Sequence, residues 1–222
     1  KVAVASSNVL PKALMMMICL SDAGKRYNRE WIFRHFNYNF ELGQSYAITG
    51  PNGSGKSTLL QVVSGSMYAN EGKIQFTINN KVCADENVYK HVSICAPYLE
   101  VIEEMTLTEF LDFHQGFKSF IPGMSSDKAI SIIGLEKARN KQIRYFSSGM
   151  KQRIKLAQCV FSDTAIVLLD EPCTNLDKEG IDMYHSLVTD YCNDRLLIVS
   201  SNDEVEYKFC NHLINISNYK IR

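Results

Sequence analysis

The stretch GPNGSGKS, residues 50–57, decides how this chain folds. It matches the pattern G-x-x-x-x-G-K-[S/T], follows a short apolar run at residues 45–49 and precedes a helix-like stretch at residues 58–63. Gly53 and Gly55 let the backbone turn so that successive N–H groups point inward, and the positive end of the following helix adds to them. The stretch therefore predicts a phosphate-binding loop between a strand and a helix.

The side chains in and around this loop fit a phosphate chain with a metal ion. Lys56 can reach the outer phosphates as a point charge, and Ser57 can offer its hydroxyl to Mg²⁺. The run LLDEP at residues 168–172 places two carboxylates at the end of an apolar strand. A carboxylate buried there is costly unless it is paired or faces a metal, so Asp170 is predicted to hold Mg²⁺ through water. Glu171 is predicted to orient and deprotonate an attacking water.

The rest of the chain alternates strand-like and helix-like segments. Strands are expected at residues 14–20, 31–42, 45–49, 72–79, 91–95, 165–170, 195–200 and 212–216. Helices are expected at 58–63, after Thr106 or Thr108, after Ser125 or Ser126 with a stop at Gly134, and at 176–191. The pattern predicts an α/β fold with a mostly parallel sheet core, an N-terminal antiparallel β region and a helical subdomain at about residues 98–146.

Composition excludes several classes of protein. The 222 residues suffice for one domain, expected at 15–222, and the balance of 24 basic and 24 acidic residues gives no net attraction to nucleic acid or an anionic membrane. Seven cysteines without a C-x-x-C pair favour a reducing compartment. The apolar run at 14–20 is short for a membrane span and is interpreted as a strand, with a signal peptide as the alternative. Residues 1–14 are expected to be a non-native or disordered extension.

From about Met17 to the C-terminus, the chain resembles the ATP-binding cassette (ABC) ATPases, in the short single-cassette form of a transporter's ATP-binding subunit. The phosphate loop and the Asp-Glu strand occur in many nucleotide hydrolases, as expected of a P-loop NTPase. FSSGMKQR, residues 146–153, resembles the more diagnostic signature sequence of the family, usually Leu-Ser-Gly-Gly-Gln. TNLD, residues 174–177, resembles the loop that touches the opposite subunit, and Tyr27 matches the aromatic residue that stacks on adenine.

The resemblance implies ATP and Mg²⁺ as cofactors and a homodimer or paired cassette that forms on ATP binding. A helix that starts at residues 147–149 is an anion site by its backbone N–H groups alone, and in the family this turn binds the γ-phosphate of ATP held by the other protomer. The residues implied to bind ATP are Tyr27, Gly50, Asn52, Gly53, Ser54, Gly55, Lys56, Ser57 and Thr58. The signature residues implied to bind the partner's ATP are Ser147, Ser148, Gly149 and Met150, and Asp177 belongs to the dimer loop.

Two positions depart from the family pattern. The family places a Gln where SICAPYLE, residues 93–100, has Ala96 or Pro97, and a His where this chain has Asn202. Asn can donate a hydrogen bond to a γ-phosphate oxygen, but it cannot take up a proton. Low basal hydrolysis is therefore expected. The acidic residues at 100–109 either compensate for the missing Gln or form a solvated helix entry.

The leading expectation is an ATPase subunit that powers a membrane transporter, an exporter, through ATP-driven dimerisation. It would lie in the cytoplasm, at the inner face of the membrane, held there by a separately encoded transmembrane subunit. No nucleic-acid partner is expected. One alternative is a soluble ABC-type ATPase acting on nucleic acid or a protein assembly, supported only by the basic residues at 137–155. Another is a weakly hydrolysing, ATP-gated clamp, suggested by the two departures.

Overall fold

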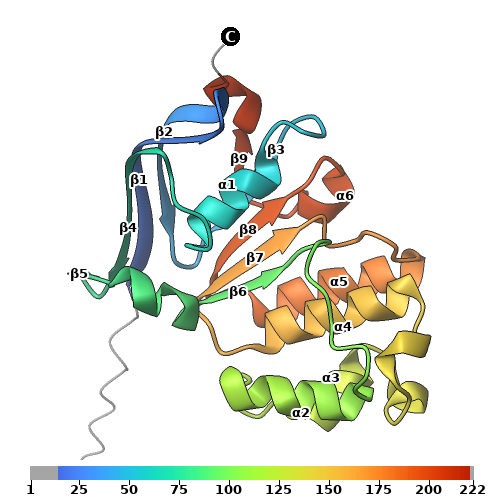
Figure 1. Ribbon diagram of the computed structural model, residues 1–222. Coiled ribbons are helices and arrows are strands. Elements are labelled where there is room, and N and C mark those ends of the chain that lie inside the picture. The colour runs from blue at the N-terminus through green and yellow to red at the C-terminus, as the bar shows by residue number, and fades with distance from the viewer. Residues whose placement is uncertain (1–14, 221–222) are drawn as a thin grey trace, which may run out of the picture.

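A five-stranded parallel sheet forms the centre of the molecule (Figure 1). The computed structural model describes residues 15–220, so the expectation for residues 1–14 lies outside the described residues. The sheet has the order β6-β7-β8-β3-β9, and all its neighbouring strands run parallel. Its strands are β3 (Ser45–Thr49), β6 (Val92–Cys95), β7 (Ile166–Asp170), β8 (Leu196–Ser200) and β9 (His212–Asn215). The predicted α/β class with a parallel core is confirmed.

An antiparallel sheet covers one side of the parallel one and has the order β2-β1-β4-β5. Its strands are β1 (Met16–Tyr27), β2 (Glu30–Glu41), β4 (Glu71–Ile78) and β5 (Lys81–Val82). The helix α1 (Lys56–Val63) lies between the two sheets, and its apolar side chains share one core with both (Figure 1). Three fully buried rings of β2, Phe33, Phe36 and Phe40, belong to that core. This packing fixes the phosphate loop, which leads directly into α1.

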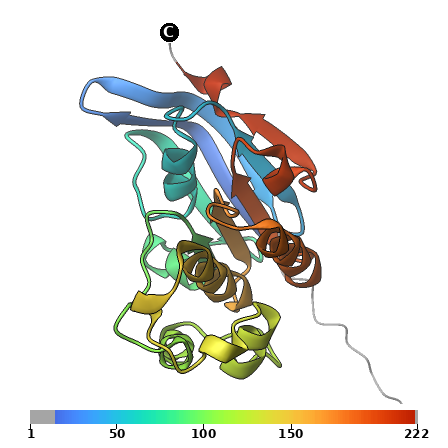
Figure 2. The same ribbon diagram turned by 90° about the vertical axis from the view of Figure 1, so that its right-hand side faces the viewer.

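The remaining helices cover the other face of the parallel sheet. They are α2 (Leu107–Phe117), α3 (Ser126–Ile132), α4 (Ser148–Phe161), α5 (Lys178–Tyr191) and the short α6 (Glu204–Tyr207). Figure 2 views α4 and α5 nearly end-on, with α2 and α3 on their far side from the sheet. A second core joins the buried faces of α2 to α5 to β7 and β8. The helices at 98–146 thus pack on the sheet through α4 and α5.

Local capping decides where these helices begin. The side chain of Thr106 accepts a hydrogen bond from the backbone of Glu109, whose carboxylate reaches back to Thr106 N, so Thr106 and not Thr108 caps α2. Ser125 caps α3 by the same kind of contact. Helix α5 begins two residues later than the predicted 176, because Asp177 is its N-cap. The Asp177 side chain accepts a hydrogen bond from Gly180 N at 2.8 Å.

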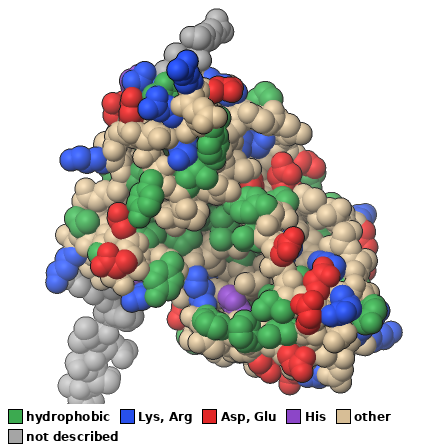
Figure 3. All heavy atoms as spheres, viewed as in Figure 1, with side chains coloured by type: hydrophobic (Ala, Val, Ile, Leu, Met, Phe, Trp, Pro, Cys, Tyr) green, Lys and Arg blue, Asp and Glu red, His purple; other side chains and the backbone are tan. Residues whose placement is uncertain are grey.

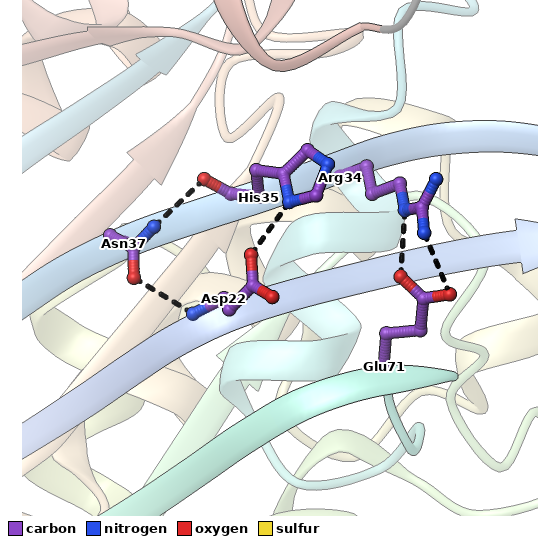
Figure 4. A network of polar contacts seen from close by, with 5 residues as sticks. All are labelled: Asp22, Arg34, His35, Asn37 and Glu71. Atoms are coloured by element: carbon purple, nitrogen blue, oxygen red, sulfur yellow. Dashed lines mark hydrogen bonds and ion pairs between the residues drawn. The ribbon is translucent and has the colours of Figure 1, made fainter.

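Polar contacts hold the irregular middle of the antiparallel sheet (Figure 4). Asp22 and His35 have positive φ values of 51° and 55°, near register shifts between β1 and β2. Asp22 N donates to Asn37 Oδ1 at 2.8 Å, and the His35 ring nitrogen lies 2.7 Å from Asp22 Oδ1. Arg34 makes two hydrogen bonds to the carboxylate of Glu71 on β4. These contacts let β1 continue to Tyr27, beyond the apolar run at 14–20 that marked it in the sequence.

We expect Gly72→Ala to lower the free energy of unfolding by at least about 3 kcal/mol, because strain and a backbone clash combine at this site. Gly72 has φ +76°, and an added Cβ would lie 2.2 Å from Asp22 O. Gly43 is a matched control, with φ +75° and no atom within 4 Å of its Cβ position. Gly43→Ala should therefore cost only about 1 to 2 kcal/mol. Urea unfolding of both variants measures the difference, and equal losses would contradict this account.

We expect acid to destabilise the protein partly through His114 of α2. Its Nε2 lies 2.9 Å from Ser162 Oγ, and burial, helped by Lys118, lowers the pKa of His114 from 6.5 to about 4. Below pH 6.5 the unfolded state therefore binds more protons than the folded state. The stabilising contribution is complete above pH 6.5 and is lost as the pH falls towards 4. Urea unfolding between pH 7 and 5 should show a steeper loss for wild type than for His114→Gln, whereas parallel curves would contradict the prediction.

Candidate functional site

The phosphate loop runs from the end of β3 to the start of α1, as predicted. Gly55 stands just before the first helical residue with φ +106°, and a Cβ there would lie 2.3 Å from the Ile32 side chain of β2. Only glycine fits this position, both in conformation and in space. The Ile32 side chain of β2 thus packs directly against the loop, just before the N-terminus of α1.

A cavity of about 220 Å³ opens over this loop. It is lined by Ile32, Asn52, Gly53, Gly55, Lys56, Ser57, Thr58 and Glu171. The fold therefore brings most of the predicted loop residues together with Glu171, which stands more than 110 positions away in the sequence. The predicted residues Tyr27, Ser147, Ser148, Gly149, Met150 and Asp177 are not among the lining residues of this cavity.

Lys56 is buried at the base of the loop, with 5% of its surface exposed. Its Nζ donates to Gly50 O at 2.9 Å and lies 3.4 Å from Pro51 O. Two neutral carbonyl groups compensate a buried ammonium only in part, since a charge out of water normally needs an opposite charge. The site around Lys56 is thus suited to an anion such as a phosphate group.

Asp170 shows that the site fits a hydrated metal ion. Its carboxylate is 1% exposed, and within residues 15–220 its Oδ1 finds no hydrogen-bond partner. The hydroxyls of Ser54 and Ser200 are likewise buried without a partner in that part of the chain. Buried polar atoms are nearly always satisfied in proteins, so the Asp170 oxygen is suited to a polar ligand. Mg²⁺ with its water shell would be such a ligand, and Asp170 and Ser57 would be the residues that hold it.

Glu171 sits in a strained turn directly after β7. Its φ is +44°, a left-handed conformation that costs about 1 to 3 kcal/mol for a residue other than glycine and is found most often at functional sites. The N–H of Glu171 donates to Ser200 O of β8 at 2.9 Å, which holds the turn to the sheet. The side chain lines the cavity beside the phosphate loop, where it can act on a water near the outer phosphate.

Asn202 follows the end of the neighbouring parallel strand β8 and touches the phosphate loop there. Its Nδ2 donates to Asn52 Oδ1 at 2.7 Å, although 150 positions separate the two residues. The residue at the position of the usual His therefore contacts the phosphate loop, although it does not line the cavity. In the stretch that lacks the family's Gln, Ala96 is fully buried and Pro97 is exposed, and neither lines the cavity.

The signature stretch begins α4, as predicted. Ser147 is the N-cap, and its hydroxyl accepts a hydrogen bond from Met150 N at 3.2 Å. A Cβ on Gly149 would lie 2.8 Å from Asn175 O, so the helix start packs tightly against the TNLD loop. Arg153 joins the same two segments through an ion pair with Asp177. The signature residues and Asp177 thus form one continuous surface, separate from the phosphate-loop cavity of the same chain.

Tyr27 ends β1 with its ring largely free. Its surface is 48% exposed, and its hydroxyl donates to Met67 Sδ at 3.4 Å. Because the ring is exposed and its hydroxyl is held, it is suited to stack on a planar base.

The site also contains residues that the sequence did not point to. Ile32 looked like an ordinary strand residue but lines the cavity, and Glu206 binds the turn that follows Glu171.

Comparisons with known proteins show the family and the fold to which the chain is similar. The family described as ABC transporter matches residues 33–174. An uncharacterized ABC transporter ATP-binding protein of Bacillus subtilis is 34% identical over 178 residues, covering 78% of each chain. A cytochrome c biogenesis ATP-binding export protein of Xylella fastidiosa is 30% identical, over 70% of this chain and 68% of its own. A solved ATP-binding cassette, dimeric with bound ADP and phosphate, superposes with a TM-score of 0.75 at 20% identity, over 92% of this chain and 96% of that one.

Proposed function

This chain belongs to the ABC transporter family of ATP-binding proteins, and we propose that it hydrolyses ATP to power the export of a substrate by a membrane transporter. The observation that carries the proposal is the cavity that joins the phosphate loop to Glu171, with the unsatisfied carboxylate of Asp170 beside it. ATP-binding proteins of this family have this combination of a phosphate loop and an Asp-Glu strand end. The presence of both parts in this chain supports the proposal.

Different residues of the site are proposed to bind the phosphates, hold the metal ion and activate the water. The N–H groups of the loop and Lys56 hold the phosphates, while Ser57 and Asp170 hold Mg²⁺, which neutralises charge on the phosphate oxygens. Glu171 orients the attacking water and takes its proton. Asn202 donates to a γ-phosphate oxygen but accepts no proton, so we propose that basal hydrolysis is slow.

A second copy of the chain completes the site. The residues 147–150 do not line the cavity of their own chain, yet they present a capped helix N-terminus suited to an anion. We therefore propose that two chains meet head to tail, with the signature turn of each over the γ-phosphate of the other. Asp177 and its loop lie at the same surface, joined to α4 by Arg153.

The partner at the membrane is proposed to be a separately encoded transmembrane subunit. No helix within residues 15–220 is long and apolar enough to cross a membrane. The proposed helical subdomain, about residues 98–146 of a domain spanning 15–222, exposes two rings of α2 in edge-to-face contact, Phe113 and Phe117. Figure 3 shows apolar side chains on the face where α2 lies. We propose that the transmembrane subunit docks at this face and keeps the chain at the cytoplasmic side of the membrane.

The basic segment 137–155 gives little support to a nucleic-acid partner. Four of its seven basic side chains form ion pairs with acidic residues: Arg139 with Asp127, Arg144 with Glu104, Lys151 with Glu103, and Arg153 with Asp177 and Glu179. These pairs neutralise the local positive charge that phosphate contacts would require. We therefore propose no nucleic-acid partner, and the second candidate function, favoured by Asn202, is an ATP-gated clamp.

Phosphate release by the purified chain, measured over a wide range of protein concentrations with Mg-ATP in excess, tests the function. An ATPase whose site is shared by two chains should release phosphate slowly, with a rate per chain that rises with concentration. If Mg-ATP binds and drives dimerisation but no phosphate is released at any concentration, the clamp is the function and the ATPase proposal fails. If the chain does not bind ATP, both proposals fail.

A further inference from the structure

Glu206 is a buried acid on α6 that the proposed mechanism does not use. It is 5% exposed, and within residues 15–220 it forms no ion pair. Burial raises the pKa of Glu206, and the carboxylates of Asp203 and Glu171 also raise it, while the Ser201 hydroxyl and the Cys173 N–H lower it. A buried carboxylate without an ion pair is unfavourable, so its hydrogen bonds must compensate for the loss of contact with water.

The Glu206 carboxylate holds the turn that carries Glu171. Its Oε1 accepts a hydrogen bond from Cys173 N at 2.6 Å, two residues after Glu171. The other end of this turn is held by the bond from Glu171 N to Ser200 O. Both holding groups come from the end of β8 and the segment just after it. The left-handed backbone of Glu171 is thus fixed at both sides by one short stretch of chain, 200–206.

The same stretch contacts the phosphate loop. Asn202 donates to Asn52 of the loop, and the segment continues into α6 through the bond from Glu206 N to Asp203 O. Tyr184 of α5 is fully buried and donates a hydrogen bond to Glu206 O at 2.7 Å, which holds α6 against α5. A ligand that changes the Asn52–Asn202 contact therefore acts on a segment whose far end holds the turn that carries Glu171.

We propose that Glu206 is a positioning residue that fixes Glu171 for catalysis and links its position to the phosphate loop through residues 200–206. This proposal rests on the proposed ATPase function. Glu206 does not line the cavity, and it acts through the backbone of residues 171–173. Losing its acceptor should lower kcat and leave ATP affinity unchanged, because the phosphate loop keeps all of its own contacts.

The test compares Glu206→Leu with Glu206→Gln, because Gln keeps an oxygen acceptor for Cys173 N. We expect the Leu variant to lose about 10- to 100-fold in kcat, as catalytic groups do when displaced by about 1 Å, with its KM and ATP dissociation constant within about threefold of wild type. The Gln variant should recover most of kcat. Glu136→Leu is the matched control, since it makes the same change at a carboxylate that accepts a hydrogen bond from Ser131 Oγ, outside the turn, and it should leave kcat unchanged.

Hydrogen exchange of the backbone amides of Glu171, Cys173 and Thr174 gives a readout that does not depend on turnover. It should speed up at least about tenfold in Glu206→Leu and stay near the wild-type rate in Glu206→Gln, because only the Leu variant frees the Cys173 amide. If wild type binds ATP but does not hydrolyse it, the ATPase function fails, while exchange still decides whether Glu206 holds the turn. Unchanged exchange in the Leu variant, or equal losses of kcat and ATP affinity, would overturn the proposal.

Discussion

Glu171→Gln is expected to bind Mg-ATP with an affinity close to that of wild type and to lose at least about 100-fold in turnover. Gln keeps the length and hydrogen-bonding shape of Glu but cannot take the proton of the attacking water. The backbone of Glu171, pinned to Ser200 O, is unaffected by the change, so the fold and the phosphate loop should stay intact. With hydrolysis blocked, the ATP-bound dimer should accumulate.

Three measurements on the same preparation check this expectation: phosphate release, equilibrium nucleotide binding, and the mass of the particle by light scattering with and without Mg-ATP. Asp190→Asn on α5 is the matched control, because it removes an exposed carboxylate that does not line the cavity. Turnover at the wild-type rate in Glu171→Gln would mean that another group activates the water. A monomer at saturating Mg-ATP would contradict the shared site.

The parts of the fold that depend on local sequence could be predicted. A strand, a glycine-rich turn and a helix must follow one another around GPNGSGKS, because only glycine accepts the backbone found at Gly55. The cap of α2 is predicted only as Thr106 or Thr108, although Glu109, three residues after Thr106, provides the capping-box signal that distinguishes them. The end of β1 was not readable. Residues 21–27 are largely polar, and pairing with β2 and β4 keeps them in the sheet.

The parts of the site that depend on topology could not be predicted in detail. The parallel strand order places Asn202 beside Asn52, and no local pattern in either segment shows that contact. Glu206 stands in the polar stretch SSNDEVEYK, where it resembles a surface acid. It is buried because α6 is held by Tyr184, whose own position is set by the packing of α5. The family signature pointed to the chemistry, but only the fold shows what holds Glu171 in place.

Lys56→Met is expected to weaken Mg-ATP binding by at least about 100-fold, since charge-assisted hydrogen bonds to two phosphates are lost together. The unliganded protein should keep its stability or gain some. The Lys56 ammonium is buried against two carbonyl groups, and Met has a similar length without a charge that must leave water. The prediction thus separates ligand binding from folding at a single residue.

Thermal unfolding with and without Mg-ATP measures both effects at once. At a ligand concentration of 100 times the wild-type dissociation constant, binding adds about 2.7 kcal/mol to wild-type stability, and at most about 0.4 kcal/mol remains if affinity falls 100-fold. Lys73→Met, an exposed lysine of β4, controls for the loss of a positive charge and should keep the full ligand shift. A Lys56→Met variant with the wild-type ligand shift would show that the phosphates bind elsewhere. A variant that unfolds readily without ligand would show instead that the ammonium, through Gly50 O, is needed to build the loop.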